Sequence, residues 1–218
     1  MVSNSDVRPP VIMDLGDGSY YYNYNIREVV VEQENEDEPT KKGYEYETAH
    51  IWNNPTLERI VSVSGNNSAD FKAEAYKALV AEGYALPDLD LVKQIRAEQL
   101  SEYDKSSNVN GFVFGGQTMW IDKLTRIPLL TTLSILEGAG ETKTELWTDS
   151  VPAVAVPIEI ATLKQMLYAI EIYATNCLNV TKQHANKIFA AESEIIVWSY
   201  DFTVGYPPKL NFDEMAGG

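Results

Sequence analysis

Alternating polar and apolar positions predict β-structure at the beginning of the chain. Residues 43–52 (GYEYETAHIW) carry tyrosine, threonine and histidine at every second position, with glutamate and alanine between them. This period predicts a strand with two different faces. Residues 19–33 (SYYYNYNIREVVVEQ) are rich in tyrosine and β-branched side chains, which predicts a second long strand or a tight strand pair. An acidic run and Pro39 separate the two stretches, so we expect an antiparallel hairpin with a charged, solvated tip.

Helical periodicity dominates the rest of the chain. Short strands are expected over 142–148 and 154–156, and residues 195–202 (IIVWSYDF) predict a final strand. Pro128 falls inside an expected helix, where it either introduces a kink or begins a separate helix. Apolar residues at spacings of three and four predict helices over 55–63, 69–82, 89–103, 121–136 and 158–190.

A small hairpin that leads into a helix is predicted over residues 106–126 (SSNVNGFVFGGQTMWIDKLTR). Its Gly115–Gly116 pair can supply the positive φ angles of a tight turn. Asp122 precedes Arg126 by four residues, which suits the start of a helix because the acid meets the positive end of the helix dipole. We expect the aromatic residues beside the turn to lie mostly in the core. The candidate structural signature of this region is Phe112, Phe114, Trp120, Asp122, Arg126 and Trp147.

These elements together predict an α+β fold in three parts. Residues 1–87 form an N-terminal arm, an aromatic antiparallel β-hairpin and helices. Residues 88–202 form a compact domain made of a β-hairpin and two helices. Residues 203–218 have no hydrophobic period and are expected to form an extended C-terminal arm, as are residues 1–11 at the other end.

Charge and composition restrict the class of partner. The chain of 218 residues has a net charge of -15, which disfavours nucleic acid and anionic membrane surfaces as partners. A basic protein partner fits this charge better.

The beginning of the chain lacks the features of a signal peptide, and no apolar run reaches the length of a membrane helix. The single cysteine, Cys177, excludes an internal disulfide, so we expect folding in a reducing cytoplasm.

Candidate catalytic groups are few, and each has a simpler structural interpretation. His50 and His184 lack the partners and spacing of a zinc or general-base site, so structural roles are expected. Asp122 and Arg126 could act as an acid and an anion clamp, but a pair at the start of a helix is the preferred interpretation. We nominate no catalytic, metal-binding or cofactor-binding residue, and we do not expect an enzyme.

The tyrosine-rich hairpin has more aromatic residues than two strands can bury by themselves. Either the hairpin packs on the helices, or it presents an aromatic face to another chain. Tyrosine is also common on sugar-binding surfaces, which leaves a carbohydrate interpretation open. The candidate interface residues are Tyr22, Tyr24, Tyr44, Tyr46 and Trp52.

Residues 91–188 contain a recognisable set of positions, namely Asn110–Phe112, Phe114, Gly116, Trp120–Asp122, Arg126, Gly138, Leu146–Trp147, Met166–Leu167, Tyr173–Ala174 and His184. Through these positions, residues 91–188 resemble a domain of unknown function from tailed bacteriophages and prophages, including those of gut Bacteroidales. The domain occurs in proteins associated with tail fibres or with tail-fibre assembly. Weaker likeness extends to the YYYNY hairpin and the WNNPT turn. The resemblance implies no catalytic residues.

The resemblance implies a phage tail context with other tail or fibre proteins as partners. The first hypothesis is an accessory protein of the virion that is made in the host cytoplasm and acts through protein–protein contacts. Further copies of the same chain are among the partners considered. Extended ends that lock neighbouring subunits favour this hypothesis. The second is a transient tail-fibre assembly chaperone. The third is a module that binds or cleaves host glycans, and cleavage would need two carboxylates about 5 to 10 Å apart, which the sequence cannot nominate.

Overall fold

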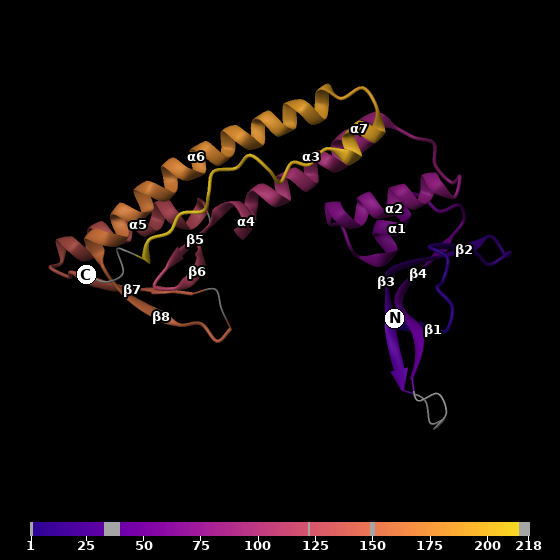
Figure 1. Ribbon diagram of the computed structural model, residues 1–218, viewed down its shortest axis with the longest axis horizontal. Helices are drawn as coiled ribbons and strands as arrows, with labels where there is room; N and C mark the ends of the chain where they lie inside the picture. The colour runs from indigo at the N-terminus through magenta and orange to yellow at the C-terminus, as the bar shows by residue number, and fades with distance from the viewer. Residues whose placement is uncertain (1, 33–39, 122, 149–150, 214–218) are drawn as a thin grey trace. The chain divides into compact units, whose positions relative to one another are not determined.

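The computed structural model describes residues 2–32, 40–121, 123–148 and 151–213, and Figure 1 shows its helices and strands. The chain forms two compact units, Met1–Ile95 and Arg96–Gly218. The combination of helices with antiparallel sheets confirms the predicted α+β class.

The sequence predicted a boundary after residue 87. The division falls instead within helix α3 (Leu89–Lys105), whose N-terminus is fixed where the Asp88 carboxylate accepts hydrogen bonds from the backbone N–H groups of Asp90 and Leu91.

Unit 1 is built on a four-stranded antiparallel sheet rather than on an isolated hairpin. The predicted hairpin of the two longest strands is confirmed, with Tyr20 opposite Ile51 and Tyr24 opposite Glu47. The N-terminal segment, expected to be an arm, instead supplies an edge strand that pairs with residues 44–47. Residues 33–39 at the hairpin tip lie outside the described residues. In spatial order, the strands are β1 (Val2–Ser5), β4 (Thr40–Trp52), β3 (Ser19–Glu32) and β2 (Ile12–Asp14).

Two capped helices complete unit 1, namely α1 (Leu57–Ser64) and α2 (Ala69–Ala81). The side chain of Thr56 accepts a hydrogen bond from the Arg59 N–H, and that of Ser68 accepts one from the Phe71 N–H. Each cap satisfies a backbone donor that the first turn leaves free. The helices bury their apolar faces against one face of the sheet. The core there includes Tyr22, Ala49, Ile51, Ile60, Phe71, Ala75 and Leu79.

Unit 2 combines two small hairpins with two long helices. Gly115 and Gly116 have φ angles of 60° and 69°, which confirms the predicted glycine turn of the first hairpin. The core lies between the hairpins and the helices and contains Phe112, Phe114 and Leu163. After α3, the elements are α4 (Ser107–Asn110), β5 (Gly111–Phe114), β6 (Gln117–Trp120), α5 (Lys123–Gly138), β7 (Lys143–Trp147), β8 (Ala155–Glu159), α6 (Ile160–Ala190) and α7 (Glu194–Ser199).

Local differences from the predicted elements have simple causes. The final strand expected over 195–202 is wrong, because Ser193 caps a short helix, α7, and only Val197 of its apolar side chains is fully buried. Pro128 lies inside α5 and does not divide it. Pro157 lies in strand β8 of a two-stranded sheet, and the helix after it begins at Ile160.

The C-terminal segment is extended, as expected, but it is not a free arm. The backbone N–H of Val113 donates to Leu210 O at 2.9 Å, and the N–H of Phe212 donates to Val113 O at 2.8 Å. Phe212 is only 7% exposed and packs in the core of unit 2, with its ring edge-on to Phe112. The yellow segment in Figure 1 accordingly returns along α6 towards β5. The free arm predicted for 203–218 is therefore corrected as far as residue 213.

Replacement of Phe212 should show that this segment is part of the core. Phe212→Ala is expected to lower the free energy of unfolding by about 3 kcal/mol, because it leaves a cavity between the hairpin and α6. The control Phe189→Ala removes a ring that is 53% exposed, and it should change stability by about 0.5 kcal/mol or less. Urea unfolding of the full chain, followed by circular dichroism, measures both. Equal effects of the two variants would show that the segment does not stabilise the unit.

Candidate functional site

The sheet of unit 1 divides the predicted interface tyrosines between its two faces. Tyr22 is only 2% exposed, and its ring stacks on that of Tyr24 at 5.7 Å. Both rings pack edge-on against Phe71 of helix α2. Burial raises the pKa of Tyr22 to about 12. Tyr22 and Tyr24 therefore belong to the face that the helices cover, and the single contact face expected from the sequence is corrected.

The other candidate interface residues, Tyr44, Tyr46 and Trp52, lie together on the opposite face of the sheet. Strand β4 alternates regularly, so Tyr44, Tyr46 and Trp52 share one face. His50 lies between them in sequence, and its ring packs against Trp52 at 4.7 Å and against Tyr21 of β3 at 5.2 Å. Trp52 is 63% exposed. We call Tyr21, Tyr44, Tyr46, His50 and Trp52 the outer face.

A buried polar residue, Asn23, lies among the side chains of the outer face. Asn23 is 3% exposed; its Nδ2 donates to Pro10 O at 2.8 Å, and its Oδ1 accepts from the Thr48 hydroxyl at 2.9 Å. A cavity of about 410 Å³ opens beside Tyr21, Tyr46 and His50. The Nε2 atom of His50 is buried and makes no hydrogen bond within the described part of the chain. The spacing of Tyr44 and Tyr46 in the sequence is enough to predict that they share one face of a strand. That Tyr21 lies on the same face follows only from the register between β3 and β4.

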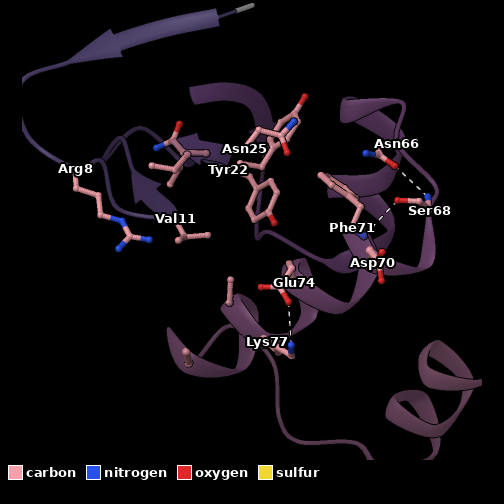
Figure 2. A pocket seen from close by; sticks show the side chains of 15 residues that line it. Arg8, Val11, Tyr22, Asn25, Asn66, Ser68, Asp70, Phe71, Glu74 and Lys77 are labelled. Carbon is pink, nitrogen blue, oxygen red and sulfur yellow. Dashed lines mark hydrogen bonds and ion pairs between the residues drawn. The ribbon is translucent and has the colours of Figure 1, made fainter. Parts of the chain in front are cut away.

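A second cavity, of about 580 Å³, lies between the sheet and α2 on the covered side. Figure 2 shows the rings of Tyr22 and Phe71 close together in it, with Arg8 towards one end. Its acidic lining residues, Asp70 and Glu74, are exposed, and Glu74 forms an ion pair with Lys77 at 2.9 Å. The lining residues of this cavity thus provide no shielded acid of the kind that general acid catalysis uses.

The structure separates the signature residues of unit 2 into core and surface. Phe112 and Phe114 are each 1% exposed, which confirms their core position. Trp120 is 39% exposed and Trp147 is 59% exposed, so the core position expected of Trp120 is corrected. The reason is strand alternation: Met119, next to Trp120 on β6, takes the inward position and is 2% exposed.

Arg126 is buried and pairs with a residue that the sequence did not indicate. Only 2% of its side chain is exposed, and its Nε lies 3.2 Å from Oε1 of Glu171 on α6. Asp122, the partner predicted from the i,i+4 spacing, lies outside the described residues. No local pattern could have predicted the Arg126–Glu171 pair, because antiparallel packing of α5 and α6 brings the two residues together.

His184 has the structural position expected of it. Its Nε2 lies 2.9 Å from Val204 O, and its Nδ1 lies 2.5 Å from the Tyr200 hydroxyl. A carbonyl oxygen can only accept, so Nε2 carries a proton, and in the neutral ring Nδ1 then accepts from the Tyr200 hydroxyl. The 5% exposed ring thus ties helix α6 to the returning C-terminal segment.

Cys177 is a buried free thiol on α6. Burial raises its pKa, which lowers the fraction of reactive thiolate at neutral pH. Across the residues with described positions, no group of three His, Cys, Asp or Glu side chains is placed to hold a metal ion. None of the helices described here combines the length and the apolar character needed to cross a membrane.

The comparisons with known proteins give no match: no family model fits the chain, and neither a curated protein nor a solved structure is significantly similar to it. The placement of the candidate residues therefore carries the functional argument.

Replacement of His184 tests its structural role. His184→Leu should lower the free energy of unfolding by about 1–3 kcal/mol, because the Tyr200 hydroxyl and Val204 O lose their buried partner. Gln183→Leu alters the adjacent, exposed position on α6 and serves as the control. Thermal unfolding of both variants gives the comparison. A His184→Leu protein as stable as the control would contradict the role of the ring as a tie between segments.

Proposed function

We propose that the protein is a non-enzymatic accessory protein of a phage tail or tail fibre that acts through protein–protein contacts. The observation that carries the proposal is the outer face of unit 1. The solvent face of an antiparallel sheet is normally polar, yet here it carries Tyr44, Tyr46 and Trp52 with a histidine between them. Tyrosine and tryptophan are enriched in the cores of protein interfaces.

Unit 2 supports the same class of function with its own exposed apolar surface. Leu124 and Ile127 on α5 are 86% and 66% exposed, and Tyr168 and Ile172 on α6 are 59% and 68% exposed. Single exposed apolar residues are common, but groups of them on adjacent helices are typical of interaction sites. Salt bridges between Arg126 and Glu171 and between Lys164 and Glu137 join these helices, so the surface has a defined geometry.

The net charge of -15 favours a basic partner surface, because complementary charge speeds association and disfavours acidic competitors. The phage tail context rests on the resemblance of residues 91–188 to tail-fibre-associated domains. We infer synthesis in the host cytoplasm followed by incorporation into the virion, with tail or fibre proteins, or further copies of this chain, as partners. Nucleic acid and membrane partners are not part of the proposal.

The choice between virion component and assembly chaperone now has to be made by experiment. Extended ends awaiting neighbouring subunits were the argument for a virion component. The C-terminal segment to residue 213 is instead held by contacts within its own unit, so this argument no longer separates the two. A glycan-binding role keeps one specific observation in its favour, namely the cavity of about 410 Å³ beside Tyr46 and His50 on the outer face.

The double variant Tyr44→Ala/Tyr46→Ala tests the outer face as an interface. It should abolish capture of the partner from a phage-producing lysate, because both rings leave the face while the covered side of the sheet is unchanged. Tyr84→Ala is the matched control: Tyr84 is 38% exposed and packs on Tyr20. Capture is quantified by mass spectrometry after affinity purification. Unchanged capture by a folded double variant would refute the interface, and loss of binding to a saccharide array would favour the glycan-binding role.

Mass spectrometry of purified, salt-washed virions tests the location. For a virion component we expect the chain in a fixed ratio to the other tail proteins, because a subunit held by specific contacts has a defined copy number. Detection only in the lysate, bound to free fibre protein, would assign the chaperone role and overturn the virion proposal.

A further inference from the structure

A cavity of about 530 Å³ within unit 2 combines apolar walls with an ion pair between a buried arginine and a partly exposed glutamate. Trp120 from β6, Leu124 from α5 and Leu178 from α6 provide apolar lining. The charged lining residues are Arg126 and Glu171, which form the ion pair, together with Asp104 and Lys105 at the end of α3. This volume lies within the range of about 300–1,000 Å³ that is typical of small-molecule sites. The function proposed above needs no ligand here, although Leu124 and the Arg126–Glu171 pair also belong to the exposed surface of α5 and α6 that supports it.

The guanidinium of Arg126 is incompletely paired in this cavity. Its side chain is 2% exposed, and its Nε lies 3.2 Å from Glu171 Oε1. The Nη1 atom is also buried and has no hydrogen-bond partner in the described ranges of the chain. An arginine remains charged at every accessible pH, and a buried charged donor without an acceptor costs more than a neutral one.

The chemistry of the cavity restricts what could complete this site. Guanidinium nitrogens only donate hydrogen bonds, so the missing partner is an acceptor. A carboxylate matches the planar fork of arginine best, and its charge strengthens the bond. Glu171 already supplies one negative charge beside Arg126. A single additional negative charge therefore fits better than the double charge of a phosphate monoester, because repulsion from Glu171 grows with the charge of the ligand.

We propose that this cavity is a binding site for a small monocarboxylate with an apolar body. The carboxylate accepts a hydrogen bond from Arg126 Nη1. The apolar body packs against Trp120 and the leucines at positions 124 and 178. The inference does not depend on the outer face of unit 1, and binding of a small carboxylate requires no tail or fibre partner.

Titration of the full chain with 4-phenylbutyrate tests the site, with the uncharged 4-phenylbutyramide as the matched control probe. The readout is the indole N–H signal of Trp120 in a nitrogen–proton correlation spectrum, assigned with Trp120→Phe. Trp52 and Trp147 are exposed at 63% and 59%, and their signals report non-specific binding. The carboxylate should shift the Trp120 signal saturably, with an affinity at least about tenfold above that of the amide. Equal affinities, or no saturable shift at Trp120, would overturn the proposal.

Two variants with opposite expected effects complete the test. Arg126→Met keeps the apolar volume and should weaken 4-phenylbutyrate binding at least about tenfold. Glu171→Gln keeps the shape but removes the competing negative charge, so binding should tighten at least about threefold. The second variant preserves a test if Arg126→Met does not fold. Unchanged or weaker carboxylate binding by Glu171→Gln would contradict the assigned electrostatics and overturn the site.

Discussion

The antiparallel register of β3 and β4 is the constraint on which unit 1 depends. With Tyr20 opposite Ile51 and Tyr21 opposite His50, neighbouring tyrosines point to opposite sides of the sheet. One set becomes core against α1 and α2, and the other set forms the outer face. A shift of one residue would exchange these two sets. The core and the outer face are therefore two consequences of the same pairing.

Unit 2 depends on contacts between residues that are far apart along the chain. Its hairpin β5–β6 forms locally, but the core closes only when the returning segment adds Phe212 beside Phe112. Two further residues make long-range contacts of this kind. His184 binds the returning segment through Val204 O, and Arg126 links α5 to α6 through Glu171. Arg126 also lines the cavity of about 530 Å³. Substitutions there require stability measurements beside any functional assay.

Both units expose aromatic or apolar side chains, and the chain as a whole is acidic. Two of the buried atoms that make no hydrogen bond within the described residues, His50 Nε2 and Arg126 Nη1, belong to residues that line a cavity. The two atoms differ in their surroundings. His50 belongs to a partly exposed aromatic face that is able to close against a partner, whereas Arg126 is a buried cation whose missing acceptor defines a ligand class.

The sequence by itself determined the elements whose signal is local. Period-two alternation predicted β4, glycine pairs predicted the β5–β6 turn, and apolar stripes predicted most helices. The tertiary structure decided everything that depends on a second segment: which tyrosines are covered, that Trp120 faces outward, that residues 195–199 form a helix, and that the tail joins the core. The physical reason is that the period of apolar residues shows which side chains of a helix or strand share a face. It does not show which other segment packs against that face. Burial of Tyr22 by Phe71, and the pairing of Arg126 with Glu171, follow from packing between distant segments, which no local pattern encodes.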